Sequence, residues 1–276
     1  MLTIIEVLKA ILFGVVEGIT EWLPISSTGH MILLDEFVKL NVSKEFLDLF
    51  LVVIQLGAIL AVVVIYWNKL IPLSTKHGLH ISRRKCKMWV KIIVASIPAG
   101  VVGILWDDVF TKYFYNYQTV AIMLILVGVV FIIIERSNKN KIAKIDSIDD
   151  ISYGQAFLIG VFQMIAAIFP GTSRSGSTIV GSLMLGISRT AAAEFTFFLA
   201  VPAMFGGSAI KILKYSGGFN SAEVVLLAIG MIVAFVLSII AIKFLMSYIK
   251  KHDFKVFGWY RIVLGIAVIG YFLATR

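Results

Sequence analysis

Six long apolar runs constrain this chain more than any other feature of its sequence. A helix needs about 20 mostly apolar residues to cross a bilayer. Runs of this kind are residues 46–67, 88–106, 118–134, 190–213, 222–246 and 256–274. Hydrophobic residues make up 59% of the chain, whereas soluble domains are roughly 45–50% apolar. The sequence therefore predicts an all-α integral membrane protein with six transmembrane helices.

Two further apolar regions, residues 1–40 and 151–187, are each interrupted near the middle by a proline. Pro24 and Pro170 both precede a stretch that is rich in hydroxyl side chains. Proline ends a helix because its ring and its missing N–H break the hydrogen-bond ladder, and Ser and Thr favour the N-cap of the next helix. Each region is therefore predicted to be a re-entrant helix-loop-helix hairpin with a polar tip.

The first hairpin concentrates polar groups between apolar flanks. A helix over residues 7–23 puts Glu17 and Glu21 four residues apart on one face, and two like charges at this spacing destabilise an ordinary helix. A second helix is expected to start near Thr28 and to carry His30 in its first turn. Because this arrangement is costly in an apolar surrounding, it indicates a functional site.

The second hairpin has a tip that is suited to binding an anion. Residues 170–178 are rich in Gly and hydroxyl residues, so the backbone can turn tightly and expose N–H groups. The helix that follows carries partial positive charge at its N-terminus. Arg174 adds a planar fork of donors that matches phosphate oxygens. A charge this deep in a bilayer is rare outside a functional cavity.

The two hairpins align as an internal repeat. A shift of 146 residues lays Gly14 on Gly160, Glu17 on Gln163, Pro24 on Pro170, Ser26 on Thr172 and Ser27 on Ser173. Each half has one hairpin and three spans, and because three is odd the second half enters the membrane from the opposite side. The predicted fold is one membrane domain over residues 1–276, built as an inverted-topology repeat. Its first repeat is residues 1–135, its second is residues 151–276, and a cytoplasmic linker of residues 136–150 joins them.

The basic residues predict how the chain is oriented. Residues 68–91 contain seven Lys and Arg and no acid, and the stretches 135–150 and 249–255 contain four and three Lys and Arg. Cytoplasmic loops carry an excess of Lys and Arg, so both termini are expected on the outer face of the membrane. The net charge of +9 is thereby attributed to orientation in the bilayer, and no nucleic-acid partner is expected.

The two tips also resemble those of a known family. Residues 14–30 and 170–178 are similar to the two signature motifs of the undecaprenyl pyrophosphate phosphatases, also called the bacitracin-resistance family. The length and the span pattern agree over essentially the whole chain. The resemblance implies a bacterial plasma-membrane enzyme that removes one phosphate from undecaprenyl pyrophosphate and so recycles the carrier lipid for peptidoglycan and other envelope polymers. The active site is expected near the membrane midplane, opening outward.

The tips supply the groups that this hydrolysis needs. We assign Ser27 as the nucleophile that attacks the terminal phosphorus, with His30 or Glu21 as its base. Ser27 is preferred because the repeat lays it on Ser173 and because it precedes His30 by three residues, on one side of a helical turn. Glu17 and Glu21 would handle protons or hold a divalent ion such as Mg²⁺ or Ca²⁺. The residues assigned to the phosphate groups are Arg174, Ser173, Thr178, Ser26, Thr28, Gly171, Ser175 and Gly176.

Simpler interpretations of these residues stay open at this point. Ser26, Ser27 and Thr28 could be helix caps alone, His30 could be a packed imidazole, and Arg174 could pair with a carboxylate of the other tip. The alternative function is a transporter or flippase for an anionic lipid headgroup, because inverted repeats are common among transporters. Paired carboxylates beside a phosphate favour the hydrolase. The sequence leaves open whether a metal is required and whether the chain forms a homodimer.

Overall fold

The computed structural model describes residues 3–74 and 80–275. Its α-helices are α1 (Ile4–Thr20), α2 (Ser27–Phe37), α3 (Lys44–Ile65), α4 (Trp67–Leu70), α5 (Arg83–Phe114), α6 (Tyr117–Asn138), α7 (Tyr153–Ile168), α8 (Arg174–Met184), α9 (Arg189–Lys214), α10 (Ser221–Tyr248) and α11 (Lys255–Thr275). The 3-10 helix η1 (Ile148–Asp150) precedes α7, and the two-residue strands β1 (Leu73–Ser74) and β2 (His80–Ile81) pair antiparallel. Lys76, one of the basic residues used to predict orientation, lies outside the described residues.

Six of the described helices are long and apolar enough to cross a membrane. They are α3, α5 over Arg83–Trp106, α6, α9, α10 and α11. The prediction of an all-α multi-pass membrane protein with six spans is therefore confirmed. The second predicted span, residues 88–106, was too short, because α5 starts at Arg83 and continues to Phe114. Lys and Arg are good helix formers, so the helix extends past the apolar run on its basic side.

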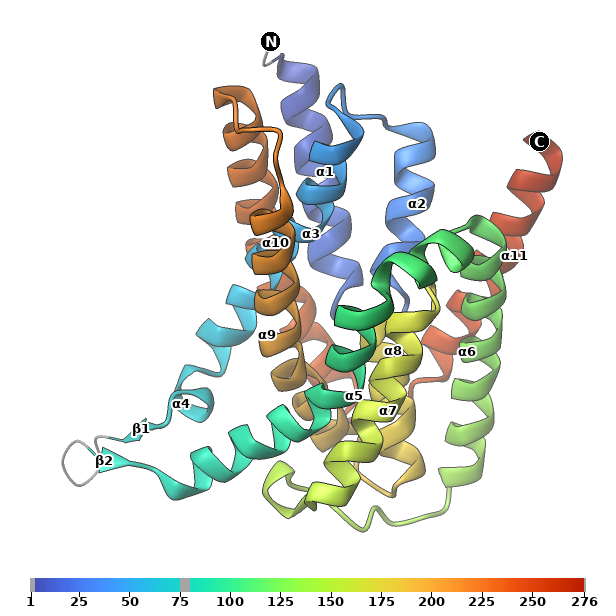
Figure 1. The fold of residues 1–276 in the computed structure, drawn as a ribbon. Helices are drawn as coiled ribbons and strands as arrows, with labels where there is room; N and C mark the ends of the chain where they lie inside the picture. Colours follow the sequence, from blue (N-terminus) through green and yellow to red (C-terminus); the bar gives the residue numbers. More distant parts are fainter. Residues whose placement is uncertain (1–2, 75–79, 276) are drawn as a thin grey trace.

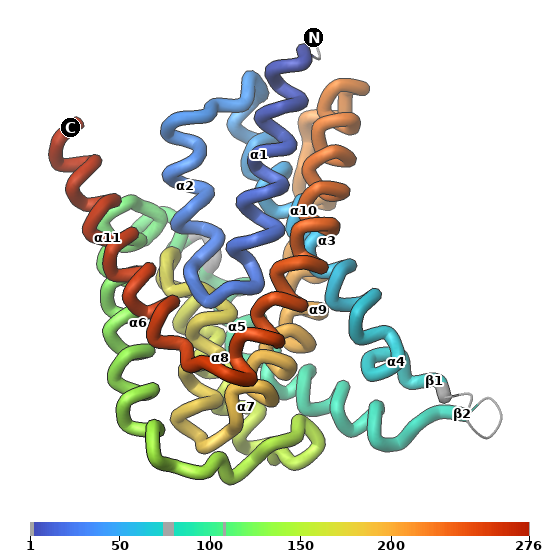
Figure 2. Tube along the Cα trace, turned by 180° about the vertical axis from the view of Figure 1, so that it is seen from behind, coloured from blue at the N-terminus to red at the C-terminus, as the bar shows by residue number. Residues whose placement is uncertain are grey.

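Two shorter helix pairs lie between the long helices. Figure 2 shows α1 and α2 running from the end of the molecule that holds the termini to a turn about halfway through it. In Figure 1, α7 and α8 approach from the opposite end. The first tip, residues 21–26, and the second tip, residues 169–173, face each other in the interior. Hydrogen bonds from Ser175 Oγ to Glu21 O (3.2 Å) and to Leu23 O (3.5 Å) join them.

The first hairpin differs from its predicted boundaries by a few residues. Helix α1 ends at Thr20, and Glu21 caps it with a helical backbone and an N–H bond to Glu17 O. The predicted end was residue 23, but Pro24 also restricts the conformation of the residue before it, so the chain leaves the helix earlier. Helix α2 starts at Ser27 with Ser26 as its N-cap, close to the predicted start.

Each short helix pair rests on a long helix at a close approach that only glycine allows. Helix α1 packs on α10, and α7 packs on α5. A Cβ added at Gly14 would lie 2.7 Å from Gly230 O, and one added at Gly160 would lie 2.2 Å from Ala95 O. Small residues at such crossings let backbones approach within the membrane. These contacts fix the depth at which the two tips meet.

Both ends of the described chain lie at the same end of the bundle. Figure 1 shows the start of α1 and the end of α11 at one end of the bundle, whereas the β1–β2 hairpin and the segment between α6 and α7 lie at the other. Two of the three stretches used to predict the orientation, the described part of 68–91 and residues 135–150, are thus on the side opposite to the termini.

Candidate active site

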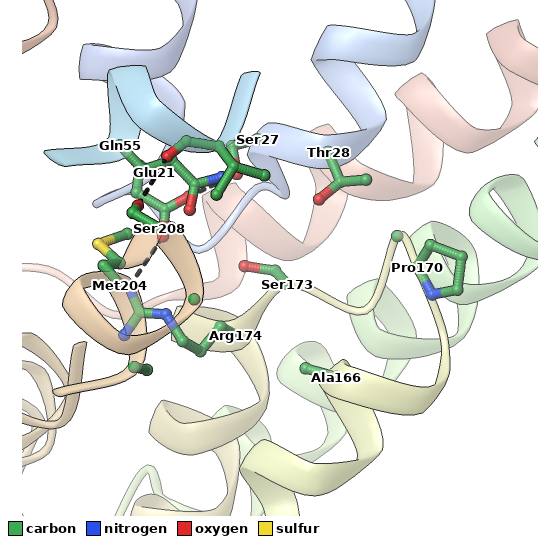
Figure 3. A pocket seen from close by; sticks show the side chains of 14 residues that line it. Glu21, Ser27, Thr28, Gln55, Ala166, Pro170, Ser173, Arg174, Met204 and Ser208 are labelled. Carbon is green, nitrogen blue, oxygen red and sulfur yellow. Dashed lines mark hydrogen bonds and ion pairs between the residues drawn. The ribbon is translucent and has the colours of Figure 1, made fainter. Parts of the chain in front are cut away.

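A cavity of about 210 Å³ lies between the two tips, α3 and α9. Figure 3 shows side chains from both tips pointing into it. Of the predicted site residues, the cavity is lined by Glu21, Ser27, Thr28, Gly171, Ser173 and Arg174. Its other lining residues are Val52, Gln55, Ala166, Pro170, Ala203, Met204, Gly207 and Ser208. Charged and hydroxyl groups therefore share a small space whose opposite wall is mostly apolar.

The Ser27 hydroxyl is positioned by the way in which α2 starts. Ser26 has a left-handed backbone (φ 73°) and accepts a hydrogen bond from Gly29 N at 3.3 Å, which caps the helix. Ser27 is consequently the first residue of α2, and its Oγ donates to Glu21 Oε2 at 2.5 Å. Figure 3 marks this contact with a dashed line. A carboxylate that accepts from a serine hydroxyl can take its proton.

Glu21 also pairs with the cation of the other tip. Arg174 Nη2 donates to Glu21 Oε1 at 2.8 Å, and Arg174 Nη1 donates to Thr196 O at 3.3 Å. A guanidinium has five N–H donors, so donors remain for an anion in the cavity. The three side chains of Ser27, Glu21 and Arg174 thus form one chain of hydrogen bonds across the two tips.

The second tip presents the start of α8 to the cavity. Ser173 has φ 69° and accepts from Gly176 N at 3.1 Å. Within the described residues, the N–H groups of Arg174 and Ser175 have no acceptor, so the positive end of the helix dipole is open to an anion. Gly171 makes the turn possible, because its φ is +89° and an added Cβ would lie 2.6 Å from Val120 O.

The backbone conformation of the two tips pairs their residues one position differently from the sequence alignment. Ser26 and Ser173 are the two non-glycine residues with positive φ among those described, and each caps the helix that follows. Ser26 is therefore the counterpart of Ser173, and Ser27 is the counterpart of Arg174. The alignment of Ser27 with Ser173 was wrong because Ser173 follows Pro170 by three residues, whereas Ser26 follows Pro24 by two. Ser27 is distinguished by its contact with Glu21 instead.

His30 does not line the cavity, and both of its ring nitrogens are hydrogen-bonded elsewhere. Its Nδ1 donates to Ser26 O at 2.7 Å, which leaves Nε2 to accept from Tyr260 OH at 2.7 Å. The two rings are stacked at 5.6 Å with an interplanar angle of 5°. Neither ring nitrogen bonds to Ser27, although the sequence analysis expected the two residues on one side of the helical turn. In this arrangement His30 holds the carbonyl of the residue that caps α2.

Several residues assigned to phosphate binding lie behind the cavity. Ser26, Ser175, Gly176 and Thr178 are buried and do not line it. The Thr178 hydroxyl donates to Arg174 O at 2.9 Å, and the Ser175 hydroxyl donates to the first tip. Thr178 is in the second turn of α8, and its side chain points toward α9, where its hydroxyl contacts that of Thr196. Ser175 therefore connects α8 to the first tip, and Thr178 connects α8 to α9.

Glu17 is also buried behind the cavity. Its side chain is 1% exposed, and its Oε1 has no hydrogen-bond partner among the described residues. An unpaired carboxylate oxygen in an apolar interior is costly. Within the described part of the chain, no three His, Cys, Asp or Glu side chains are close enough together to hold a metal ion. Glu17 lies within α1, four residues before Glu21 in the first tip.

Arg261 was not among the predicted site residues, and its side chain joins the two tips. This side chain of α11 is fully buried and donates to Pro24 O at 3.3 Å in the first tip. It also donates to Gly171 O and Thr172 O, both at 2.9 Å, in the second tip. A charge within a predicted span was the available signal, since such charges are rare in membrane helices.

Known proteins match this chain over nearly their whole length. The family model described as bacitracin resistance protein BacA matches residues 10–267. A protein of Desulfitobacterium hafniense named undecaprenyl-diphosphatase is 63% identical over 99% of this chain and 98% of its own. Undecaprenyl-diphosphatase 1 of Clostridium acetobutylicum is 62% identical over 98% of both chains. An undecaprenyl-diphosphatase of Enterococcus faecalis is 58% identical over 97% of this chain and 98% of its own. The resemblance seen in the two motifs is confirmed, and the chain belongs to the BacA bacitracin-resistance family.

Proposed function

We propose that the chain hydrolyses undecaprenyl diphosphate to undecaprenyl phosphate and inorganic phosphate, recycles the carrier lipid for envelope polymers and so contributes to bacitracin resistance. The observation that carries this proposal is the chain of hydrogen bonds from Ser27 through Glu21 to Arg174 in a cavity between apolar helices. The relatives that match over nearly their whole length are named for this activity. A diphosphate on a lipid needs a site of this kind at membrane depth.

The reaction would proceed in two steps. Glu21 accepts the Ser27 proton while Ser27 Oγ forms a bond to the terminal phosphorus, and the bond from that phosphorus to the bridging oxygen breaks. Undecaprenyl phosphate leaves with the bridging oxygen and its electron pair, and this oxygen takes the proton from Glu21, so that Glu21 is a carboxylate again before the second step. Water then attacks the phosphoserine, Glu21 takes a proton from it, and phosphate is released as Ser27 regains its hydrogen. Arg174 and the open N–H groups of α8 stabilise the charged phosphoryl oxygens throughout.

A divalent cation is compatible with this residue set. Mg²⁺ is usually bound by one or two carboxylates together with substrate phosphates. Glu21 lines the cavity, and Glu17 has an unpaired oxygen one turn earlier on the same helix. A bound Mg²⁺ or Ca²⁺ would neutralise phosphate charge, and these two carboxylates would hold it.

We also infer that the two halves, residues 1–135 and 151–276, form an inverted repeat with re-entrant hairpins. Exchanging α1 with α7 and α5 with α10 maps the contact of α1 with α10 onto that of α7 with α5. The left-handed caps Ser26 and Ser173 correspond in the same way. On this proposal the termini lie on the outer face of a bacterial plasma membrane, and the cavity opens outward.

Phosphate release from purified protein tests the function. In detergent, with undecaprenyl diphosphate as substrate, we expect one inorganic phosphate for each undecaprenyl phosphate formed. A transporter or flippase would move the lipid in reconstituted vesicles without cleaving it. The hydrolase proposal would be abandoned if a folded preparation bound the lipid and released no phosphate with Mg²⁺ or Ca²⁺ present.

The orientation can be tested with Cys86, the only cysteine of the chain. Cys86 is partly exposed in the first turn of α5, next to basic residues. We expect a membrane-impermeant maleimide to leave it unlabelled in intact cells and to label it after permeabilisation. Equal labelling in both conditions would reverse the orientation.

A further inference from the structure

Helices α3 and α9 form the wall of the cavity that faces the tips. This wall is made of Val52, Gln55, Ala203, Met204, Gly207 and Ser208. Gln55 and Ser208 are its polar side chains. The Ser208 hydroxyl is 1% exposed and donates to Val52 O at 3.1 Å, so it serves to join α9 to α3. Gln55 is left as the polar side chain of this wall that can reach a bound molecule.

The position of Gln55 is unfavourable for a side chain with no ligand. It lies in the middle of α3, which is one of the six helices apolar enough to cross a membrane. Its carboxamide makes no hydrogen bond to any residue that the structure describes, and a polar group without partners in a membrane span is costly. Gln55 therefore lines the same cavity as Ser27 and Arg174 with its hydrogen-bonding capacity unused.

We propose that Gln55 is a further substrate-binding residue, which donates its amide N–H to an oxygen of the diphosphate. This inference rests on the proposed function. The chemistry fits, because the cavity already holds the negative Glu21 and the positive Arg174, and a neutral amide adds donors without changing that charge balance. The diphosphate has more oxygens than one guanidinium and one helix end can satisfy. Gln55 would donate a hydrogen bond from α3 to one of the remaining diphosphate oxygens.

Gln55→Met tests the proposal, because it keeps the length of the side chain and removes both donors. A hydrogen bond to a charged group is worth enough that we expect kcat/KM for undecaprenyl diphosphate to fall by about tenfold. The inhibition constant of inorganic pyrophosphate, used as a competing probe, should rise by a similar factor. The matched control is Gln118→Met, the same change at an exposed position at the start of α6, which should leave both constants within about twofold of the wild type.

Gln55→Glu gives a second readout that does not depend on how the Met variant folds. At pH 8 the added negative charge should repel the diphosphate, so the loss should exceed that of the Met variant. As the pH is lowered, protonation restores a donor, and the ratio of the Glu variant to the wild type should rise.

The two proposals fail in different ways. If the wild type releases no phosphate from the lipid, the proposed function fails. If the wild type is active and Gln55→Met has wild-type kcat/KM and pyrophosphate inhibition, the role of Gln55 is overturned. For a Met variant that does not fold, a Glu variant whose activity ratio stays at one from pH 5 to pH 8 overturns it equally.

Discussion

Ser27→Ala is expected to lower kcat by at least about 10³-fold, or roughly 4 kcal/mol of barrier. The Ser27 hydroxyl is the group in the cavity whose proton is already directed at a carboxylate, Glu21 Oε2 at 2.5 Å. Removing it takes away the atom that forms the bond to phosphorus, whereas Arg174 and the start of α8 stay in place. The variant should therefore still bind a diphosphate lipid. Single-turnover phosphate release and lipid binding measure the two effects separately.

The neighbouring serine provides the control. Ser26→Gly removes a hydroxyl one residue away and keeps a residue that accepts the left-handed backbone, so helix α2 loses its side-chain cap without added strain. We expect it to reduce kcat by less than about tenfold, because replacing such a cap with Gly costs only a few tenths of a kcal/mol. Substantial activity in Ser27→Ala would point to a water molecule activated by Glu21 as the attacking group.

The architecture of the membrane helices could be predicted from the sequence because it depends on local patterns. The length of each apolar run determines whether a helix crosses the bilayer, and Pro24 and Pro170 each come shortly after the end of a helix, which proline disfavours continuing. The serine and threonine residues after each proline cap the next helix for the same local reason. Five of the predicted spans and the start of α2 therefore agree with the structure to within a few residues, whereas α5 begins five residues before the second predicted span and ends eight residues after it.

The geometry of the tips could not be predicted in the same way, because it depends on residues that are distant in the sequence. Ser173 follows Pro170 by three residues, whereas Ser26 follows Pro24 by two. The pattern of apolar residues does not reveal this difference of one residue. His30 is hydrogen-bonded to Tyr260, which is 230 residues away in the sequence, and not to Ser27. Arg261 binds carbonyl groups from both tips, and its sequence neighbours give no sign of that role.

Arg174→Lys is expected to lower kcat/KM by at least about tenfold, which corresponds to roughly 1.4 kcal/mol of barrier. Lys keeps the charge and can still pair with Glu21, so a residue that only balances this carboxylate would tolerate the change. A guanidinium binds two phosphate oxygens at once with a planar fork, and an ammonium cannot reproduce this. Arg174→Ala, which removes the charge as well, should cost at least about 10³-fold, in the range found for arginines that stabilise phosphoryl transfer.

Arg189→Lys is the matched control for this experiment, because Arg189 makes a bidentate contact with a carboxylate but lies outside the cavity. Its Nε and Nη2 donate to the buried carboxylate of Glu135 at 2.9 Å and 2.5 Å. We expect this variant to unfold at a lower temperature and to keep kcat/KM within about twofold of the wild type. If Arg174→Lys instead behaved like Arg189→Lys, with lower stability and unchanged turnover, Arg174 would serve to hold the two tips together. The phosphoryl oxygens would then be stabilised by the open N–H groups at the start of α8.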